Sequence, residues 1–293
     1  AAQDAWVHAL AQRLQTFGDD GVYLDGSGYI HSPCKNQLHG CGYVADDGTV
    51  HPTYPVFGHR ELLKRIYVTV KSRRPQGVVD LHHSFGQNTA GLSFADILWT
   101  GEHWNHLKHT GAPDGYISGE LPLDMFRAEF MGLPIGVPTE MLAYRLMGNQ
   151  AQAGSRKKVS AISLLHDVPV RARTQDKQWF GFMSKLWKMR DGFQAHEAQK
   201  LFYWENQDYV RVGPQKCYAT LLAHRKNGVL AFISNLSRDQ QRVTVEFDGI
   251  GRNGCLDGGR ARRMTEQRHF TYVMPGRDVG YDDAAPTDRA RHR

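Results

Sequence analysis

The chain alternates short apolar runs with longer segments in which apolar residues recur at helical spacing. Each apolar run has the length of a strand and ends in titratable side chains; the first reads Gly-Val-Tyr-Leu-Asp and ends at Asp25. Buried parallel strands are continuously apolar, and in β/α folds their carboxyl ends carry the functional groups. The runs cover residues 21–25, 77–83, 96–104, 135–140 and 168–171. This alternation predicts an α/β protein with its chemistry at the ends of parallel strands.

Helical periodicity separates the runs. In residues 4–17, Asp4 is available to cap a helix and Gly18 to end it. The predicted apolar face of this helix consists of Trp6, Val7, Leu10, Leu14 and Phe17. Similar spacing predicts helices over residues 57–71, 122–131 and 179–193. Residues 150–171 are ambiguous, because 161–165 suit a helix and 168–171 a last short strand.

Beyond about residue 200 the pattern becomes that of strands, including a hairpin over 218–234 with Asn227-Gly228 as its turn. We therefore expect a catalytic β/α barrel portion over residues 1–200, a β-sandwich-like domain over 201–280 and a disordered tail over 281–293. Five strands are too few for the eight of a TIM-type barrel, so we interpret them as strands four to eight, with the earlier ones missing. A smaller open α/β sheet is the alternative. The pattern assigns no structure to residues 249–268.

Composition and charge narrow the class of protein. The chain has 293 residues, of which 41% are hydrophobic and 23% charged, and no apolar run is long enough to cross a bilayer. The net charge of +6 comes from basic residues that concentrate in the last forty positions, so we predict neither a nucleic acid nor a membrane as partner. Four cysteines are too few for a disulfide framework. The first residues show no start methionine and no signal pattern, so we expect a truncated N-terminus; the compartment stays open, and an extracytoplasmic one is compatible with the sequence.

A long loop follows Asp25. Residues 26–55 contain His31, Cys34, His39 and Cys41 together with several glycines and prolines. Loops of this length inside a compact domain are usually functional, so we expect this one to form the wall of a pocket, with His39 or Tyr43 contributing to it.

Asp25 and Glu102 are the predicted catalytic pair. Hydrolysis of a glycosidic bond needs one carboxylate as nucleophile or base and a second to protonate the leaving oxygen. Asp25 lies at a glycine-bounded turn, where it should be hydrated and ionised. Glu102 lies between Trp99 and Trp104, where apolar surroundings would raise its pKa. We expect a retaining mechanism, with Asp25 as nucleophile and the two carboxylates about 5–5.5 Å apart. A gap of roughly 6.5–9.5 Å would instead make the enzyme inverting, with Asp25 as a base toward a water.

Four stretches, residues 20–26, 38–43, 79–82 and 122–132, resemble those of a largely uncharacterised bacterial family described as glycoside-hydrolase-like, and the likeness covers most of residues 4–247. The resemblance implies a barrel, a C-terminal β domain and carbohydrate processing. More distantly, the strand ending at Asp25 is similar to the fourth strand of α-galactosidase-like and endo-α-N-acetylgalactosaminidase-like enzymes, where this aspartate is the nucleophile. In the α-galactosidase-like group the acid comes from the sixth strand, which matches a position at or near Glu102. Asp80 competes for either role.

A carbohydrate is accordingly the predicted partner, and we predict neither a cofactor nor a catalytic metal. The residues expected to contact the sugar lie at strand ends, on one helix and in the long loop: His39, Tyr43, His82, His83, Trp99, Trp104, Arg127, Glu140 and Arg171.

Two alternatives remain. The many histidines and carboxylates at strand ends are also typical of metal-dependent hydrolases, and a chain that lacks part of its barrel could bind carbohydrate without turnover. In the loop, Cys34, His39 and Cys41 are either free buried thiols beside a histidine or ligands of a structural zinc ion.

Overall fold

The structure is a computed structural model that describes residues 2–26, 32–83, 88–102, 123–132, 136–142, 153–171, 177–237, 241–247 and 268–274. The chain divides into two compact units. The first comprises Ala1–Leu107, Pro122–Tyr144 and Val168–Arg171, and the second comprises the other residues. The sequence suggested a boundary near residue 200, whereas residues 145–167 and 172–200 group with the second unit. The expected tail over 281–293 lies outside the described residues.

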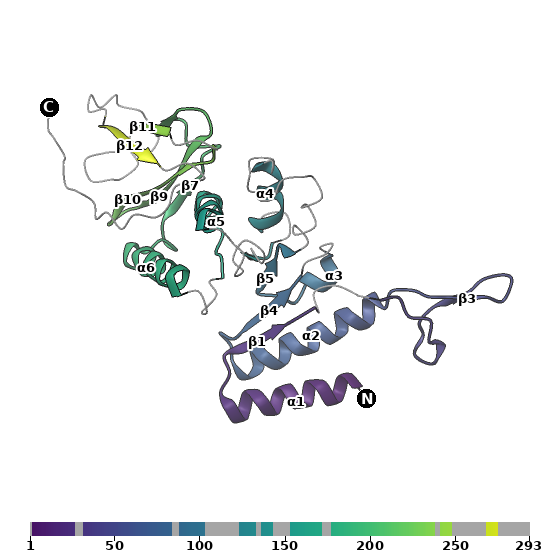
Figure 1. Ribbon diagram of the computed structural model, residues 1–293. Helices are drawn as coiled ribbons and strands as arrows, with labels where there is room; N and C mark the ends of the chain where they lie inside the picture. Colours follow the sequence, from purple (N-terminus) through teal and green to yellow (C-terminus); the bar gives the residue numbers. More distant parts are fainter. Residues whose placement is uncertain are drawn as a thin grey trace. The chain divides into compact units, whose positions relative to one another are not determined.

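A parallel sheet forms the centre of the first unit (Figure 1). Its strands are, in spatial order, β1 (Gly21–Leu24), β4 (Val78–His82), β5 (Ile97–Thr100) and β6 (Thr139–Met141). All three pairs of neighbouring strands are parallel. A single parallel bridge between Met141 of β6 and Val170 places Val170 beside the edge of the sheet. The predicted parallel strands are thus confirmed, in an α/β protein that also has antiparallel sheets. Closure into a barrel stays a prediction.

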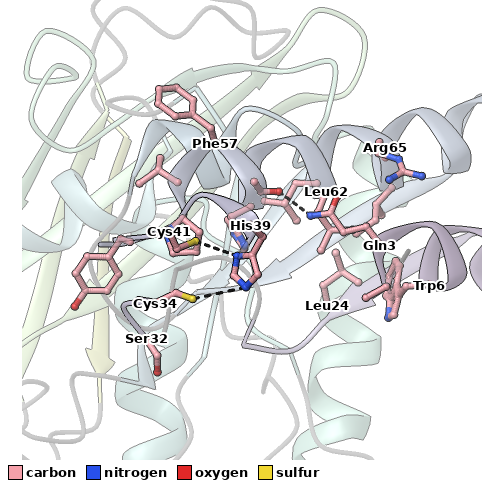
Figure 2. A pocket seen from close by; sticks show the side chains of 18 of the residues that line it. Gln3, Trp6, Leu24, Ser32, Cys34, His39, Cys41, Phe57, Leu62 and Arg65 are labelled. Atoms are coloured by element: carbon pink, nitrogen blue, oxygen red, sulfur yellow. Dashed lines mark hydrogen bonds between the residues drawn. The ribbon is translucent and has the colours of Figure 1, made fainter. Parts of the chain in front are cut away.

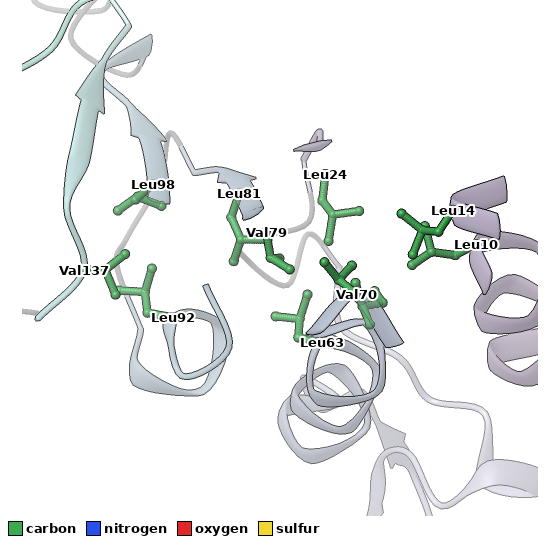
Figure 3. Close-up of a cluster of buried hydrophobic side chains, with 11 residues drawn as sticks. Leu10, Leu14, Leu24, Leu63, Val70, Val79, Leu81, Leu92, Leu98 and Val137 are labelled. Carbon is green, nitrogen blue, oxygen red and sulfur yellow. The ribbon is translucent and has the colours of Figure 1, made fainter. Parts of the chain in front are cut away.

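One face of this sheet is buried against helices. Strands β1, β4 and β5 direct alternate residues to this face, where they pack against α1 (Ala2–Phe17), α2 (Val56–Arg73) and the short α3 (Thr89–Leu92). Helices α1 and α2 lie side by side. The buried cluster, shown in Figure 3, consists of Leu10, Leu14, Leu24, Leu63, Ile66, Val70, Val79, Leu81, Leu92, Leu98 and Val137. The apolar face predicted for α1 was too broad, since Trp6 and Phe17 are 43% and 71% exposed.

Smaller elements complete the first unit. The long loop contains the 3-10 helix η1 (Gln37–His39) and a two-stranded ribbon of β2 (Tyr43–Val44) and β3 (Val50–His51). Helix α4 (Leu123–Phe130) buries Phe126 and Phe130, whose ring centres lie 4.7 Å apart.

The second unit contains α5 (Ala153–Leu165), α6 (Lys177–Phe193) and two antiparallel sheets of three strands each. One sheet has the order β10 (Gly228–Asn235), β9 (Cys217–His224), β7 (Gln199–Leu201), and the other β12 (Arg268–Met274), β11 (Gln241–Phe247), β8 (Val210–Gly213). A buried cluster that includes Leu221 of the first sheet and Val243 of the second joins them. Helix α5 resolves the ambiguity of residues 150–171, while the sandwich assignment stays a prediction.

The hairpin of β9 and β10 has a different turn from the one predicted. A two-residue Asn227-Gly228 turn would place both residues in the loop, but Gly228 is already paired with His224. The loop is therefore the three residues 225–227, and Gly228 takes a φ of +84°. Gly228 is the first strand residue after this loop, and glycine takes such a left-handed conformation without strain. None of the described helices combines the length and apolar content that a membrane span requires.

Candidate functional site

The side of the parallel sheet away from its buried core carries polar and aromatic side chains. Tyr23, Asp80, His82, Trp99 and Glu140 define this polar face. Side chains alternate between the two sides of a strand, so Asp80 and His82 alternate with the buried Val79 and Leu81 and emerge on the opposite side. The register brings Tyr23 beside Asp80, His82 beside Trp99 and Trp99 beside Glu140.

His82 lies between the two predicted catalytic carboxylates and contacts both. Its Nδ1 lies 2.6 Å from Oδ1 of Asp25, and its Nε2 lies 3.3 Å from Oε2 of Glu102. The imidazole is the least exposed of the three, with 14% of its side chain accessible, against 74% for Asp25 and 40% for Glu102. A carboxylate only accepts hydrogen bonds, so His82 donates to both when both of its ring nitrogens carry hydrogen.

The local backbone explains how the two carboxylates reach this histidine. Asp25 directly follows β1, in a turn where Gly26 takes a φ of +62°. Glu102 follows β5 after Gly101, which has a φ of +125°. A side chain at Gly101 would also meet the carbonyl oxygen of Leu142 at 2.8 Å and the Phe130 ring at 3.3 Å. Only glycine fits both the conformation and the space, so it sets the direction in which the chain enters Glu102.

Arg171 binds the two other carboxylates of the polar face. Its guanidinium donates to Oδ2 of Asp80 at 2.6 Å and to Oε2 of Glu140 at 2.5 Å. Burial raises the pKa of Asp80 above its usual value, and the bond from Arg171 works in the opposite direction. Burial by itself would lower the pKa of Arg171, but its hydrogen bonds with Glu140 and Asp80 raise it, so this side chain stays charged. Asp80 Oδ1 is buried and has no hydrogen-bond partner among the described residues.

Tyr23 completes the site, although it was not among the residues predicted from the sequence. Its hydroxyl lies 3.0 Å from Nδ1 of His82, and its ring meets that of Trp99 edge to face at 5.6 Å. Burial, followed by the negative charge of Asp25, raises the pKa of Tyr23 well above its ordinary value of 10.0, so the phenol keeps its proton. The available signal was its position two residues before Asp25, since alternate residues of a strand share a side.

The long loop and the starts of α1 and α2 enclose a pocket of about 1550 Å³ (Figure 2). Asp25 and His39 both line it, together with Leu24, Cys34, Cys41 and Phe57. Asp80 and Glu102 are not among the residues that line this pocket, so the three carboxylates do not share it. Tyr43, the other residue expected at its wall, is likewise not part of the lining and stacks on His51 with ring centres 5.1 Å apart.

The remaining predicted residues have different positions. His83 is buried, with 1% of its surface exposed. Arg127 lies on α4, where it pairs with Asp124 at 3.0 Å. Trp104 lies outside the described residues. Glu102 is less enclosed than expected, because 40% of its side chain is exposed.

The fold and the site thus define a mixed α/β protein in which carboxylates, a histidine and aromatic rings meet at the ends of parallel strands. No protein-family model and no curated protein matches the chain. Among solved structures, it is similar to a maltogenic α-amylase from Thermotoga neapolitana, with 13% identity and a TM-score of 0.49, over 94% of this chain and 61% of that one. A GH27 β-L-arabinopyranosidase from Geobacillus stearothermophilus gives 14% identity and a TM-score of 0.45, over 94% and 60%. The chain therefore spans about three fifths of the length of these two proteins, and both likenesses are distant.

Proposed function

We propose that the protein is a glycoside hydrolase whose carboxylate pair is Asp25 and Glu102. The observation that carries the proposal is that both carboxylates contact one imidazole, that of His82, at 2.6 and 3.3 Å. They come from the ends of two different strands, which is how β/α enzymes assemble their sites. Both are partly exposed, so a substrate can reach them.

Asp25 is the proposed nucleophile. It attacks the anomeric carbon while Glu102 gives a proton to the leaving oxygen, and a covalent glycosyl-enzyme results. Glu102 then takes a proton from the water that releases the sugar, so the product keeps its anomeric configuration. Asp25 and Glu102 lie on opposite nitrogens of His82, so substrate binding has to bring them closer for this route. At a gap of roughly 6.5–9.5 Å, Asp25 would instead act as a base toward a water and the product would be inverted. The exposure of Asp25, 74% of its side chain, supports this role, because a substrate can reach the carboxylate directly.

His82 and Tyr23 are the proposed positioning residues. His82 has a carboxylate on each ring nitrogen, so one partly buried side chain restrains both reacting groups. The Tyr23 hydroxyl lies next to the nitrogen that faces Asp25. Tyr23, which is 41% exposed, also offers apolar ring surface on the polar face, against which the C–H side of a sugar can stack. One face of the Trp99 ring, the expected stacking surface, is covered by Arg171.

Asp80, Glu140 and Arg171 have a supporting role in this proposal. Both carboxylates are paired with the same guanidinium and are less exposed than Asp25. A carboxylate held by an arginine is a weaker nucleophile than one in water, which favours Asp25 over Asp80 for the first step.

A metal-dependent hydrolase is less well supported. Within the described part of the chain, the one group of at least three possible ligand atoms close enough to hold an ion is Cys34, His39 and Cys41, in the long loop. No observation therefore favours an ion between Asp25, His82 and Glu102.

A panel of aryl glycosides incubated with the full chain tests the proposal. We expect turnover of at least one member of the panel, with product anomers that retain the starting configuration when followed by NMR. Asp25→Ala should lower kcat by about 10³-fold or more, as loss of a catalytic nucleophile typically does, and should leave the fold intact. Glu61→Gln is the matched control, because Glu61 is an exposed carboxylate on α2. Full activity of Asp25→Ala would refute the assignment, and sugar binding without turnover by the unaltered chain would favour a binding protein.

A further inference from the structure

Three potential metal ligands meet in the long loop, away from His82 and its two carboxylates. The nearest ligand atoms of Cys34, His39 and Cys41 all lie within 4.8 Å of one another. Cys34 Sγ is 4.0 Å from Nε2 of His39, and Cys41 Sγ is 3.3 Å from Nδ1 of the same ring (Figure 2). Both thiols are free, and Cys41 is buried.

The fold of the loop fixes these three positions. Backbone hydrogen bonds of 2.8 and 2.9 Å in both directions tie Cys34 to Thr53, at the other end of the loop. Asn36 caps η1 by accepting from the N–H of Leu38 at 3.0 Å, and its carbonyl accepts from the N–H of Cys41 at 3.2 Å. The spacing Cys-x4-His-x-Cys therefore forms one compact turn whose ends are held to the neighbouring chain.

Glycines permit the turn that brings Cys41 back to His39. Gly40 ends η1 with a φ of +76° and donates to the carbonyl of Gln37. Gly42 takes a φ of +85°, and a side chain there would meet the carbonyl oxygen of His51 at 2.7 Å. Both positions require glycine, so the sequence specifies the turn around Cys41 closely.

We propose that Cys34, His39 and Cys41 bind one zinc ion. Thiolate and imidazole are the ligands that zinc prefers, and its bond lengths place neighbouring ligand atoms of a tetrahedral site about 3.5–3.8 Å apart. One zinc ion takes a single nitrogen of His39, and with one ligand atom from each residue the three atoms lie within 4.8 Å of one another, so shifts of about 1 Å would bring them to that spacing. The N–H of Asn36 also faces Sγ of Cys34 at 3.5 Å, the kind of outer contact that orients a metal-bound thiolate.

The site would hold the wall of the pocket in place. All three ligands line the pocket that Asp25 also lines, and the loop between them carries little buried apolar surface. Three protein ligands leave a fourth position for water or another small ligand. Zinc binding here does not depend on the proposed glycosidase activity, because none of the three ligands has a role in the proposed reaction.

Metal analysis of the purified full chain tests the inference. After dialysis we expect one zinc ion per chain, measured by elemental mass spectrometry. When cobalt replaces zinc, we expect a sulfur-to-cobalt charge-transfer band in the near ultraviolet. Cys34→Ser and His39→Ala should each weaken zinc binding, measured by chelator competition, by more than the roughly 10–100-fold that loss of an outer contact costs. Cys217→Ser is the control, because Cys217 is a free buried cysteine of β9 and should keep the full zinc content.

Three results would overturn the inference. These are a zinc content far below one per chain in protein reconstituted with zinc under reducing conditions, an unchanged zinc affinity in both ligand variants, and a Cys34–Cys41 disulfide that persists in the presence of mild reductant. His39 is exposed, so His39→Ala should fold, and its far-ultraviolet circular dichroism separates loss of metal from loss of structure.

Discussion

The guanidinium carbon of Arg171 lies 4.0 Å from the centre of the Trp99 ring, on the polar face of the parallel sheet. The same side chain binds Asp80 and Glu140, so one residue pairs with two carboxylates and covers an aromatic ring. Stacking of this kind suits the flat arginine side chain and not that of lysine. The polar face is therefore organised around Arg171 as well as around His82.

Replacing Arg171 with Met should destabilise the first unit. The change leaves Asp80 and Glu140 partly buried without their counter-charge. Loss of a fully buried partner typically costs 3–5 kcal/mol, and the remaining exposure of these groups reduces our expectation to about 2 kcal/mol. Urea unfolding followed by tryptophan fluorescence measures the change. The free energy of unfolding of Arg171→Lys should lie between those of the unaltered chain and Arg171→Met. A Met variant as stable as the unaltered chain would show that the ion pairs contribute no net stability.

The stability of the chain should depend on the ionisation of Asp80. Its pKa in the folded state is raised above 3.8, chiefly by burial, so the folded state holds this proton to a higher pH than the unfolded state does. The free energy of unfolding from this group therefore falls as pH rises from 3.8 through the folded pKa. In Asp80→Asn this part of the decline should be absent. Denaturant titrations of both proteins at several pH values between about 4 and 7 provide the comparison, and parallel curves would contradict the assignment.

Glu102→Gln should impair catalysis in a way that depends on the leaving group. If Glu102 protonates the leaving oxygen, an acidic phenol needs this help less than an alkyl alcohol does. We expect kcat/KM to fall by about 10²–10⁴-fold for glycosides of weakly acidic alcohols, the range typical of a lost general acid, and by much less for a dinitrophenyl glycoside. Equal losses for all leaving groups would indicate that Glu102 has another role. Glu61→Gln again serves as the control.

Gly101→Ala should destabilise the turn that carries Glu102. An alanine would be strained at a φ of +125° and would collide with the Leu142 carbonyl. We expect a loss of about 1–3 kcal/mol. Gly58→Ala is a suitable control, because Gly58 lies in α2 and a Cβ added there would meet no atom within 4 Å. Alanine at this position should stabilise by about 0.4–1 kcal/mol, so thermal melts of the two variants should shift in opposite directions.

The elements of the first unit were largely predictable from the sequence, because strand and helix periods are local properties. The apolar runs over 21–25, 77–83 and 96–104 correspond to β1, β4 and β5, which end at Leu24, His82 and Thr100. The exposed ends of α1 were not predictable, since a periodic pattern does not reveal where a helix stops contacting its neighbour. The three-residue hairpin loop was missed because strand register, rather than the Asn-Gly pair alone, decides which residues form a turn.

The individual contacts of the site required the structure. Asp25 and His82 are 57 positions apart, and Asp80 and Arg171 are 91 apart. The sequence indicated that these residues lie at strand ends, but the contact between them depends on the order and register of the strands. His82 was expected to bind a sugar hydroxyl, and its position between two carboxylates could not be inferred from its neighbours in the sequence.

Side chains along β4 alternate between the buried core and the polar face, so this one strand contributes to both stability and the site. Val79 and Leu81 are fully buried, while Asp80 and His82 emerge on the opposite side. A shift of the β4 register by one residue would exchange the two sets. The carboxylate and the imidazole would then point into the apolar core, and the valine and leucine would point to the polar face. Substitutions at Asp80 and His82 leave the packing of the core untouched. Evolution can therefore vary the chemistry of this strand by substitution, whereas a change of its length by one residue would abolish chemistry and stability together.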